Sequence, residues 1–157
     1  MKNIFMKIFL FFLLIIISSC GFKVLETTMT DFNIKNIKTS GEQRINYKIK
    51  NNLLSDSKIK SKNLINLEIN TTKKKSIKEK NIKNQITKYQ ITINTKIKLN
   101  IINKDIVENI NLTVSGDYPV GDNNSKTRNN EKSLINNLGT LLNKQVIDQI
   151  SSRINDI

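Results

Sequence analysis

Residues Gln85 to Ile102 read QITKYQITINTKIKLNII, and apolar and polar side chains alternate along this stretch with almost no interruption. The apolar positions of the alternation are Tyr89, Ile91, Ile93, Ile97, Leu99 and Ile101. A period of two places one set of side chains on one face of a β-strand and the other set on the opposite face. The stretch therefore predicts a long strand in a sheet that buries one face and keeps the other polar.

A second strand and a tight turn follow directly in the sequence. Residues Ile106 to Ser115 continue the alternation. Their apolar positions in phase are Ile106, Ile110, Leu112 and Val114. The intervening residues Asn103 to Asp105 have the length and composition of a hairpin turn. We therefore expect the two strands to pair in antiparallel orientation.

Two further strands and two loops are predicted from the same criteria. Residues Asn63 to Thr72 alternate, and Met29 to Thr39 also alternate until the phase slips by one residue at Ile37, which is typical of a β-bulge. Residues Lys73 to Asn84 are basic with little periodicity, and Gly116 to Arg128 is rich in Gly, Asp and Asn. Both of these segments predict polar loops.

Helical spacing occurs in two segments. Ile45 is the first of three apolar residues spaced four apart, and Ser40 to Gln43 precedes it with the Ser-x-x-Gln pattern of a capping box. This predicts a helix from Gly41 to about Leu54. Residues Asn130 to Asp156 carry a broad apolar stripe and predict a longer helix.

The order of these elements is strand, helix, three strands, helix. A chain of 157 residues has room for one domain. An apolar face on the sheet and on each helix must be buried against another layer. We therefore predict an α+β fold, a two-layer sandwich of two helices packed on one face of a four-stranded mixed or antiparallel sheet.

The N-terminus has the pattern of a secretory signal peptide, with an uninterrupted apolar run from Ile8 to Ile17. The run is shorter than the ~20 residues that a membrane-spanning helix needs. It ends at Ser18, Ser19 and Cys20, which resemble a bacterial lipobox, where the cysteine is acylated and freed by cleavage on its N-terminal side. We expect residues 1–19 to be removed, Cys20 to carry a diacylglycerol and an N-acyl chain, and residues 20–157 to form one domain.

The alternative for the N-terminus is a plain secreted protein with an unused thiol. Lipidation is favoured because Cys20 lies where the small residues of a cleavage site belong. It is also the only cysteine, so it has no disulfide partner within the chain. The resemblance to lipoproteins with Gly21, a residue other than Asp, after the cysteine implies sorting to the outer membrane.

The composition argues against most catalytic chemistry. The sequence has no His, so the usual neutral-pH acid/base and the commonest metal ligand are both missing. The single Cys is expected to be acylated, and the acidic residues are scattered without the spacing of a metal site. We therefore expect no enzymatic activity, no metal and no other cofactor.

The basic residues are the feature of the sequence that best suggests a ligand, since the formal net charge is +13. Lys73, Lys74 and Lys75 lie in a predicted loop, and Lys96 and Lys98 lie on the polar face of the best-predicted strand. They are candidates for binding phosphates or carboxylates. The alternatives are that they only solvate the sheet, or that they reflect the codon bias of an AT-rich genome. Nucleic acid is not expected, because the polar faces lack aromatic residues for stacking.

Taken together, these features resemble the LptE family, the lipopolysaccharide-assembly lipoproteins of Gram-negative outer membranes. The segments that carry the resemblance are Cys20–Phe22, the strand pair Lys88–Leu99 and Ile110–Tyr118, and the C-terminal helix Glu131–Ile154, which ends in Ser151–Ile154. Where that family often has Tyr-Asn after the last strand, this chain has Tyr118-Pro119. Its C-terminal helix is rich in Asn, where relatives are rich in Ala and Arg.

The resemblance implies a sandwich that lodges inside the barrel of an LptD-like partner, aids its assembly and helps deliver lipopolysaccharide to the outer leaflet. It also implies a lipid anchor in the inner leaflet of the outer membrane, with the domain facing the periplasm or the barrel lumen. Two other interpretations remain open. One is a structural or scaffold lipoprotein that binds other envelope proteins or peptidoglycan, and the other is an exported hydrolase, which needs a deep pocket with paired carboxylates.

Overall fold

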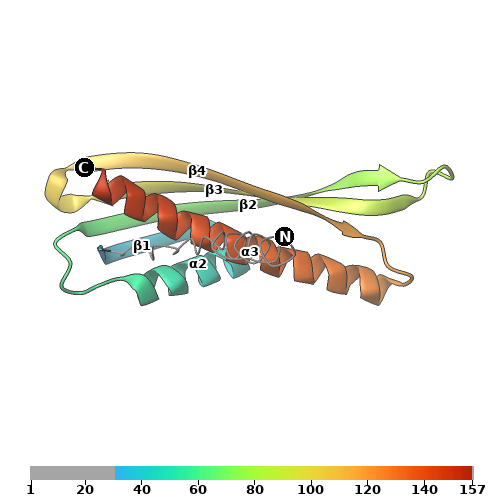
Figure 1. Ribbon diagram of the computed structural model, residues 1–157, viewed down its shortest axis with the longest axis horizontal. Coiled ribbons are helices and arrows are strands. Elements are labelled where there is room, and N and C mark those ends of the chain that lie inside the picture. The colour runs from blue at the N-terminus through green and yellow to red at the C-terminus, as the bar shows by residue number, and fades with distance from the viewer. Residues whose placement is uncertain (1–30, 157) are drawn as a thin grey trace, which may run out of the picture.

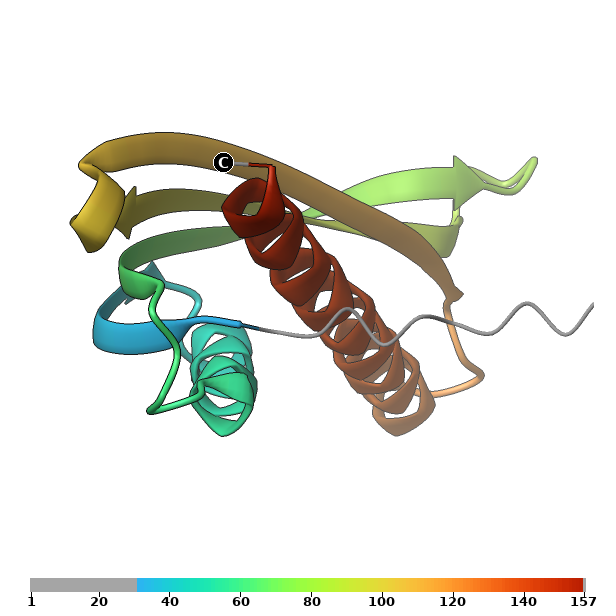
Figure 2. The same ribbon diagram turned by 60° about the vertical axis from the view of Figure 1, so that its left-hand side comes forward.

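A computed structural model describes residues 31–156 of the chain. Its elements are β1 (Asn33–Gly41), α2 (Gln43–Asp56), β2 (Leu64–Lys80), β3 (Ile86–Ile101), the 3-10 helix η1 (Ile102–Lys104), β4 (Ile106–Pro119) and α3 (Asn124–Asn155). The four strands form one sheet in chain order, and both helices lie against the same face of it (Figures 1 and 2). The predicted α+β class, with two helices on a four-stranded sheet, is confirmed. The predicted signal peptide, Cys20 and the first residues of the strand predicted from Met29 lie outside the described residues.

The sheet is mixed. β1 runs parallel to β2, whereas β2–β3 and β3–β4 are antiparallel. The turn predicted at Asn103 to Asp105 is present: β3 and β4 pair up to Ile101 and Ile106, and Asp105 adopts the left-handed conformation that closes the hairpin. The register of β1 against β2 also shifts between Ile34 and Asn36, where the sequence predicts a bulge.

The core lies between the sheet and the two helices. The alternation in β3 is confirmed, because the apolar set from Ile91 to Ile101 is buried on the helix-covered face. We call this face the inner face and the opposite one the outer face. Residues of β2, β4, both helices and Phe32 complete the core: Phe32, Ile45, Ile49, Leu53, Ile65, Leu67, Ile69, Ile110, Val114, Tyr118, Leu138, Leu142, Val146, Ile150 and Ile154.

β2 is longer than predicted, and the loop expected at residues 73–84 is wrong for most of its length. The strand continues to Lys80 and pairs with β3 until Lys80 lies opposite Ile86. The side chains of this segment show little alternation, but its backbone forms a ladder with a strongly predicted neighbour. Only residues 81–85 form the turn, where the Asn81 side chain accepts hydrogen bonds from the backbone amides of Lys83 and Gln85.

β1 ends at Gly41, which lies opposite Thr71 of β2. From Thr72 onward, β2 pairs with β3 alone, so within residues 31–156 its other edge has no neighbouring strand. β4 ends at Pro119, which lies opposite Lys88 of β3, so only the last residues of β2 and the first residues of β3 continue past it as a short two-stranded arm (Figure 1).

The capping box predicted at Ser40 does not form. Ser40 is still part of β1, and its hydroxyl accepts a hydrogen bond from the side chain of Asn70 instead. Helix α2 begins after Glu42, which has no side-chain cap bond. Pairing with β2 keeps Ser40 in extended backbone, so its hydroxyl cannot reach the amides of the helix. The buried stripe of Ile45, Ile49 and Leu53 is nevertheless as predicted.

α3 begins six residues before its predicted start, at Asn124, and spans 32 residues. The side chain of Asn123 accepts a hydrogen bond of 2.8 Å from the backbone amide of Lys126, which caps the helix. The loop predicted at residues 116–128 is wrong at both ends, because β4 continues to Pro119 and only residues 120–123 connect it to α3.

Candidate functional site

The five lysines predicted to bind anions lie in strands and on opposite faces of the sheet. Lys73 and Lys75 are in phase with the buried Thr71, so they belong to the inner face. Lys74, Lys96 and Lys98 have the opposite phase and lie on the outer face. The structure therefore divides the predicted group, and Lys73 to Lys75 are not in a loop.

Two rows of polar residues cross the outer face from β1 to β4. The first row, in register, is Lys38, Glu68, Lys98 and Asn109, and the second is Ser40, Asn70, Lys96 and Asn111. These eight residues line a shallow depression of about 660 Å³. No helix covers this face within the described part of the chain (Figures 1 and 2).

Three lysines of this depression are without an ion pair within residues 31–156: Lys38, Lys96 and Lys98. Glu68 is the one carboxylate among its lining residues, and it lies in register between Lys38 and Lys98. The outer face is thus a flat, cationic surface rich in amides, which can donate several hydrogen bonds to an anionic ligand. Lys74 lies on the same face, opposite Thr92 and away from the depression.

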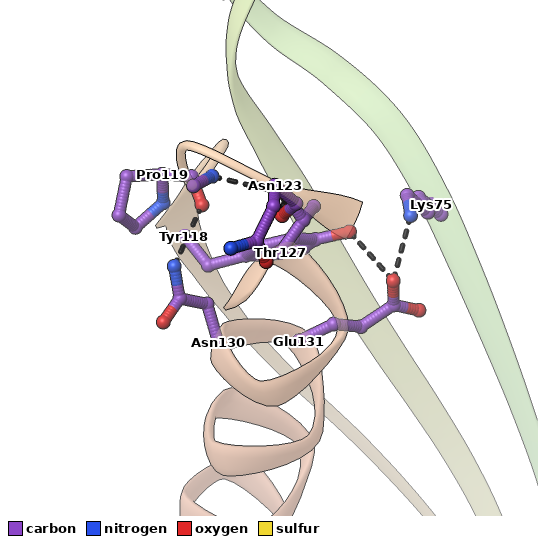
Figure 3. Close-up of polar contacts among 8 residues, drawn as sticks. Lys75, Tyr118, Pro119, Asn123, Thr127, Asn130 and Glu131 are labelled. Atoms are coloured by element: carbon purple, nitrogen blue, oxygen red, sulfur yellow. Dashed lines mark hydrogen bonds and ion pairs between the residues drawn. The ribbon is translucent and has the colours of Figure 1, made fainter. Parts of the chain in front are cut away.

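On the inner face, Lys75 connects β2 to α3 and β4 (Figure 3). Its ammonium group donates to Glu131 Oε2 at 2.7 Å, and the Tyr118 hydroxyl donates to the same oxygen at 2.8 Å. The ammonium also lies 4.3 Å from the ring centroid of Tyr89, and the rings of Tyr89 and Tyr118 stack with centroids 5.6 Å apart. The contact of Lys75 with Tyr89 is a cation–π interaction, and the contact between the two rings is aromatic stacking.

The titration of these three groups reflects their mutual contacts. The hydrogen bond from Lys75 is the main reason why the pKa of Glu131 is lowered. Burial acts to lower the pKa of Lys75, but hydrogen bonds with Glu131 and Tyr118 outweigh it, and the pKa is raised. Burial raises the pKa of Tyr118. At neutral pH the cluster therefore holds a charged Lys–Glu pair beside a neutral phenol.

Lys73 has a similar structural contact, an ion pair of 3.1 Å with Glu42 at the start of α2. Each inner-face lysine thus connects β2 to a helix. This role was not predicted from the sequence, because a run of three lysines does not show which of them have the phase of the buried face. Counting in steps of two from Thr71, which continues the alternation of Ile65, Leu67 and Ile69, would have assigned Lys73 and Lys75 to the buried face.

A groove of about 980 Å³, which was not predicted from the sequence, lies between α2 and α3. Its lining includes four cations on the helices: Arg44, Lys48, Arg128 and Lys132. These residues flank the apolar stripes of the two predicted helices. Only the distance and angle between the helices turn them into one site, and sequence periodicity does not give these quantities.

Residues 31–156 contain no group of three or more His, Cys, Asp or Glu side chains that could hold a metal ion. In the same range, no helix combines the length and the apolar character needed to cross a bilayer.

Comparison with solved structures identifies the fold class. The crystal structure of rare lipoprotein B from Shewanella oneidensis is similar with a TM-score of 0.63 at 10% sequence identity, covering 77% of this chain and 97% of that chain. The solution structure of lipoprotein B from Nitrosomonas europaea has a TM-score of 0.56 at 15% identity, covering 86% of this chain and 93% of that chain.

These similarities concern the fold, because the identities are low. The chain therefore has the two-layer fold that is found in rare lipoprotein B, over most of both chains. No family model matches the sequence, and no curated protein matches it either.

Proposed function

We propose that the protein is a lipid-anchored envelope lipoprotein, attached through acyl chains on Cys20. The proposal is supported by the lipobox-like sequence before Cys20 and by the fold it has in common with proteins described as lipoproteins. A diacylglycerol plus an N-acyl chain gives a stable anchor, because each buried methylene contributes ~0.8 kcal/mol and a single chain binds only marginally. We place the anchor in the inner leaflet of the outer membrane.

We further propose an LptE-like role, in which the domain assists an LptD-like β-barrel and binds lipopolysaccharide during its delivery. The observation that carries this proposal is the uncovered outer face, where Lys96 and Lys98 lie with Lys38 around a polar depression. Phosphates and carboxylates of lipid A and the inner core accept charge-assisted hydrogen bonds from such lysines. In this role the protein acts by binding, without catalysis, cofactor or nucleic acid, and it faces the periplasm or the barrel lumen.

Among the five predicted lysines, Lys96 and Lys98 are the strongest candidates for ligand contact. Lys74 lies on the same face and can extend the surface along β2. Lys73 and Lys75 are weaker candidates, because Glu42 and Glu131 hold their ammonium groups at the inner face.

The first test measures binding of purified lipopolysaccharide to a chain with Lys96→Glu and Lys98→Glu. We expect affinity to fall at least tenfold at low salt while the unfolding transition is unchanged, because both side chains are exposed. The matched control reverses two exposed lysines away from this face, Lys104→Glu and Lys144→Glu, which changes the net charge equally. Equal losses in both variants would mean that only overall charge matters.

The second test identifies the partner. A tagged mature chain is isolated from outer membranes, and mass spectrometry identifies what remains attached. The LptE-like role requires a large β-barrel protein in the complex. The alternative, a structural or scaffold lipoprotein, predicts other envelope proteins or peptidoglycan fragments without such a barrel.

A further inference from the structure

The groove between α2 and α3 is separate from the outer face, because it lies on the helix side of the sheet. Residues between Glu42 and Lys48, at the start of α2, form one wall of the groove, and residues between Arg128 and Gly139 of α3 form the other. Figure 2 shows the two helices side by side with α3 extending well beyond α2. Most of the groove surface is apolar, with Ile45 and Ile135 facing it from the two helices, and Tyr47 stands at its rim with 68% of its surface exposed.

Gly139 makes a notch in the α3 wall of this groove. The residue is buried, but a Cβ atom at this position would have no neighbouring atom within 4 Å. A glycine inside a helix costs ~1 kcal/mol relative to alanine. Gly139 has an ordinary helical backbone, so the conformation does not require glycine. Its effect is to leave space at the groove.

The charges around the groove are predominantly positive. Its lining has five cations and two carboxylates, and both carboxylates already form ion pairs with lysines of β2. Within residues 31–156, no ion pair involves Arg44, Arg128 or Lys132. The groove therefore combines an apolar lining with cations that have no ion-pair partner in the described part of the chain.

We propose that this groove binds one molecule of an anionic phospholipid, with an acyl chain along Ile135 and the Gly139 notch and the phosphate among the cations of Arg44, Arg128 and Lys132. Its volume of about 980 Å³ is at the upper end of the range of small-molecule pockets, roughly 300–1,000 Å³. The inference goes beyond the proposed function, since it concerns the opposite side of the sheet and requires no barrel partner.

A lipid suits the groove better than a peptide. The backbone groups of both helical walls are used within the helices, so an extended peptide would find no main-chain donors and acceptors there. An acyl chain needs no hydrogen bonds, and its single anionic headgroup matches the cations at the groove. An acidic amphipathic peptide is the competing occupant, and the experiment includes it.

The test uses the absence of tryptophan from the sequence. The mature chain, residues 20–157 with Cys20→Ser, retains every core residue described above and can be studied without detergent. Tyr47→Trp then places a single tryptophan at the groove, whose emission is followed. It is titrated with lysophosphatidylglycerol that carries bromine on its acyl chain, below the micelle concentration. We expect saturable quenching, with an affinity at least tenfold higher than for a brominated monoacylglycerol of the same chain length.

Two sets of variants locate the site. Gly139→Leu fills the notch and is expected to weaken quenching at least tenfold, whereas Thr140→Leu, on the exposed side of the same helix, is not. Arg128→Gln with Lys132→Gln is expected to remove the preference for the anionic lipid, whereas Lys104→Gln with Lys144→Gln keeps it.

Three outcomes would overturn the proposal: no saturable quenching, quenching that is insensitive to both groove variants, or stronger competition by an acidic amphipathic peptide than by the lipid. The charge variant keeps the test valid if Gly139→Leu fails to fold. Lipopolysaccharide binding by the outer-face variants is measured separately, so failure of the groove site and failure of the proposed function are distinguishable.

Discussion

Thr71 and Thr95 face each other across β2 and β3, and their hydroxyl oxygens are joined by a hydrogen bond of 3.1 Å in the core. Both residues are almost completely buried, at 0% and 1% exposure. They lie where the inner face of β2 changes from apolar residues to Lys73 and Lys75. Each hydroxyl is satisfied by the other, so the loss of one leaves a buried polar group without this partner.

We predict that Thr71→Val lowers the free energy of unfolding by about 1–3 kcal/mol, the cost of an unsatisfied buried hydroxyl. Adding Thr95→Val should recover most of this loss, because valine has nearly the same shape and both polar groups are then gone. Urea denaturation of the two single variants and the double variant gives the coupling energy. Strictly additive losses would contradict the pairing.

Gly41 is predicted to tolerate no side chain. Its φ is +88°, and a Cβ atom would lie 2.0 Å from the carbonyl oxygen of Thr71. Gly41→Ala should therefore lower the free energy of unfolding by more than about 3 kcal/mol, because it combines an unfavourable conformation with a backbone overlap.

The same substitution at Gly139 is the control for Gly41. No atom lies within 4 Å of the added Cβ, so Gly139→Ala should raise the free energy of unfolding by up to about 1 kcal/mol. Thermal unfolding of both variants measures the two effects. Equal destabilisation at Gly41 and Gly139 would show that the β1–β2 contact is not the cause.

The sequence predicts those parts of the fold in which the side chains alone determine the structure. The alternation around Ile93 correctly predicts the buried face of β3, and the slip before Ile37 marks the bulge in β1. In both cases an apolar residue must be buried, and its phase fixes the geometry. The two-layer class follows, because amphipathic helices and a one-sided sheet must cover each other.

The wrong predictions occur where backbone pairing or packing between residues distant in the sequence determines the local structure. Lys73 to Lys80 have the composition of a loop but form strand, because β3 offers a complete ladder. Ser40 has the sequence of a cap but pairs in β1. The contact of Lys75 with Glu131 joins residues far apart in the chain, and no local pattern reports it.

The Lys75–Glu131 pair predicts a pH-dependent contribution to stability. The pKa of Glu131 is lowered from its ordinary 4.5, so the contribution is complete above that value and is lost as pH falls through the lowered pKa. The pKa of Lys75 is raised from its ordinary 10.5, so the contribution is present below 10.5 and is lost as pH rises through the raised pKa.

Glu131→Gln should therefore lower the free energy of unfolding at neutral pH, by about 1 kcal/mol at most because solvent screens the partly exposed lysine. The difference from the unsubstituted protein should shrink as pH falls below about 4. Denaturant titrations at a series of pH values measure it. Glu68→Gln, which removes a carboxylate without an ion pair within residues 31–156, is the control, and a similar pH response there would contradict the assignment.

The open edge of β2 predicts a protective role for its lysines. Within residues 31–156, residues 72–80 pair with β3 on one edge and have no neighbouring strand on the other edge. An exposed strand edge can pair with another chain. Lys74 lies on this edge strand, and Lys78 lies at the register shift between Ile77 and Glu79. Lys74→Val with Lys78→Val should cause concentration-dependent self-association, measured by sedimentation velocity.

Lys96→Val with Lys98→Val is the matched control for the edge. Both residues lie in β3, which has a neighbouring strand on each side, so the same apolar replacements add surface hydrophobicity without a free edge. The control should remain largely monomeric at concentrations where the edge variant associates. Similar association of both variants would show that hydrophobicity alone is responsible.

Glu68 should oppose anion binding on the outer face, if that face binds lipopolysaccharide as proposed. Among residues 31–156 it is the only carboxylate that lines the depression, and it lies in register between Lys38 and Lys98. Glu68→Gln removes one negative charge while keeping the shape of the side chain, so affinity for lipopolysaccharide should increase several-fold at low salt. The increase should diminish at high salt, because exposed charges are screened.

The control for this charge change is Glu79→Gln, near the end of β2 and outside the depression. Both variants change the net charge equally, so a general electrostatic attraction would raise affinity in both. If the ligand binds at the lysines of the depression, its affinity should change in Glu68→Gln and not in Glu79→Gln. An unchanged affinity in Glu68→Gln would place the ligand elsewhere on the molecule, because a phosphate among these lysines lies too close to that carboxylate to be insensitive to it.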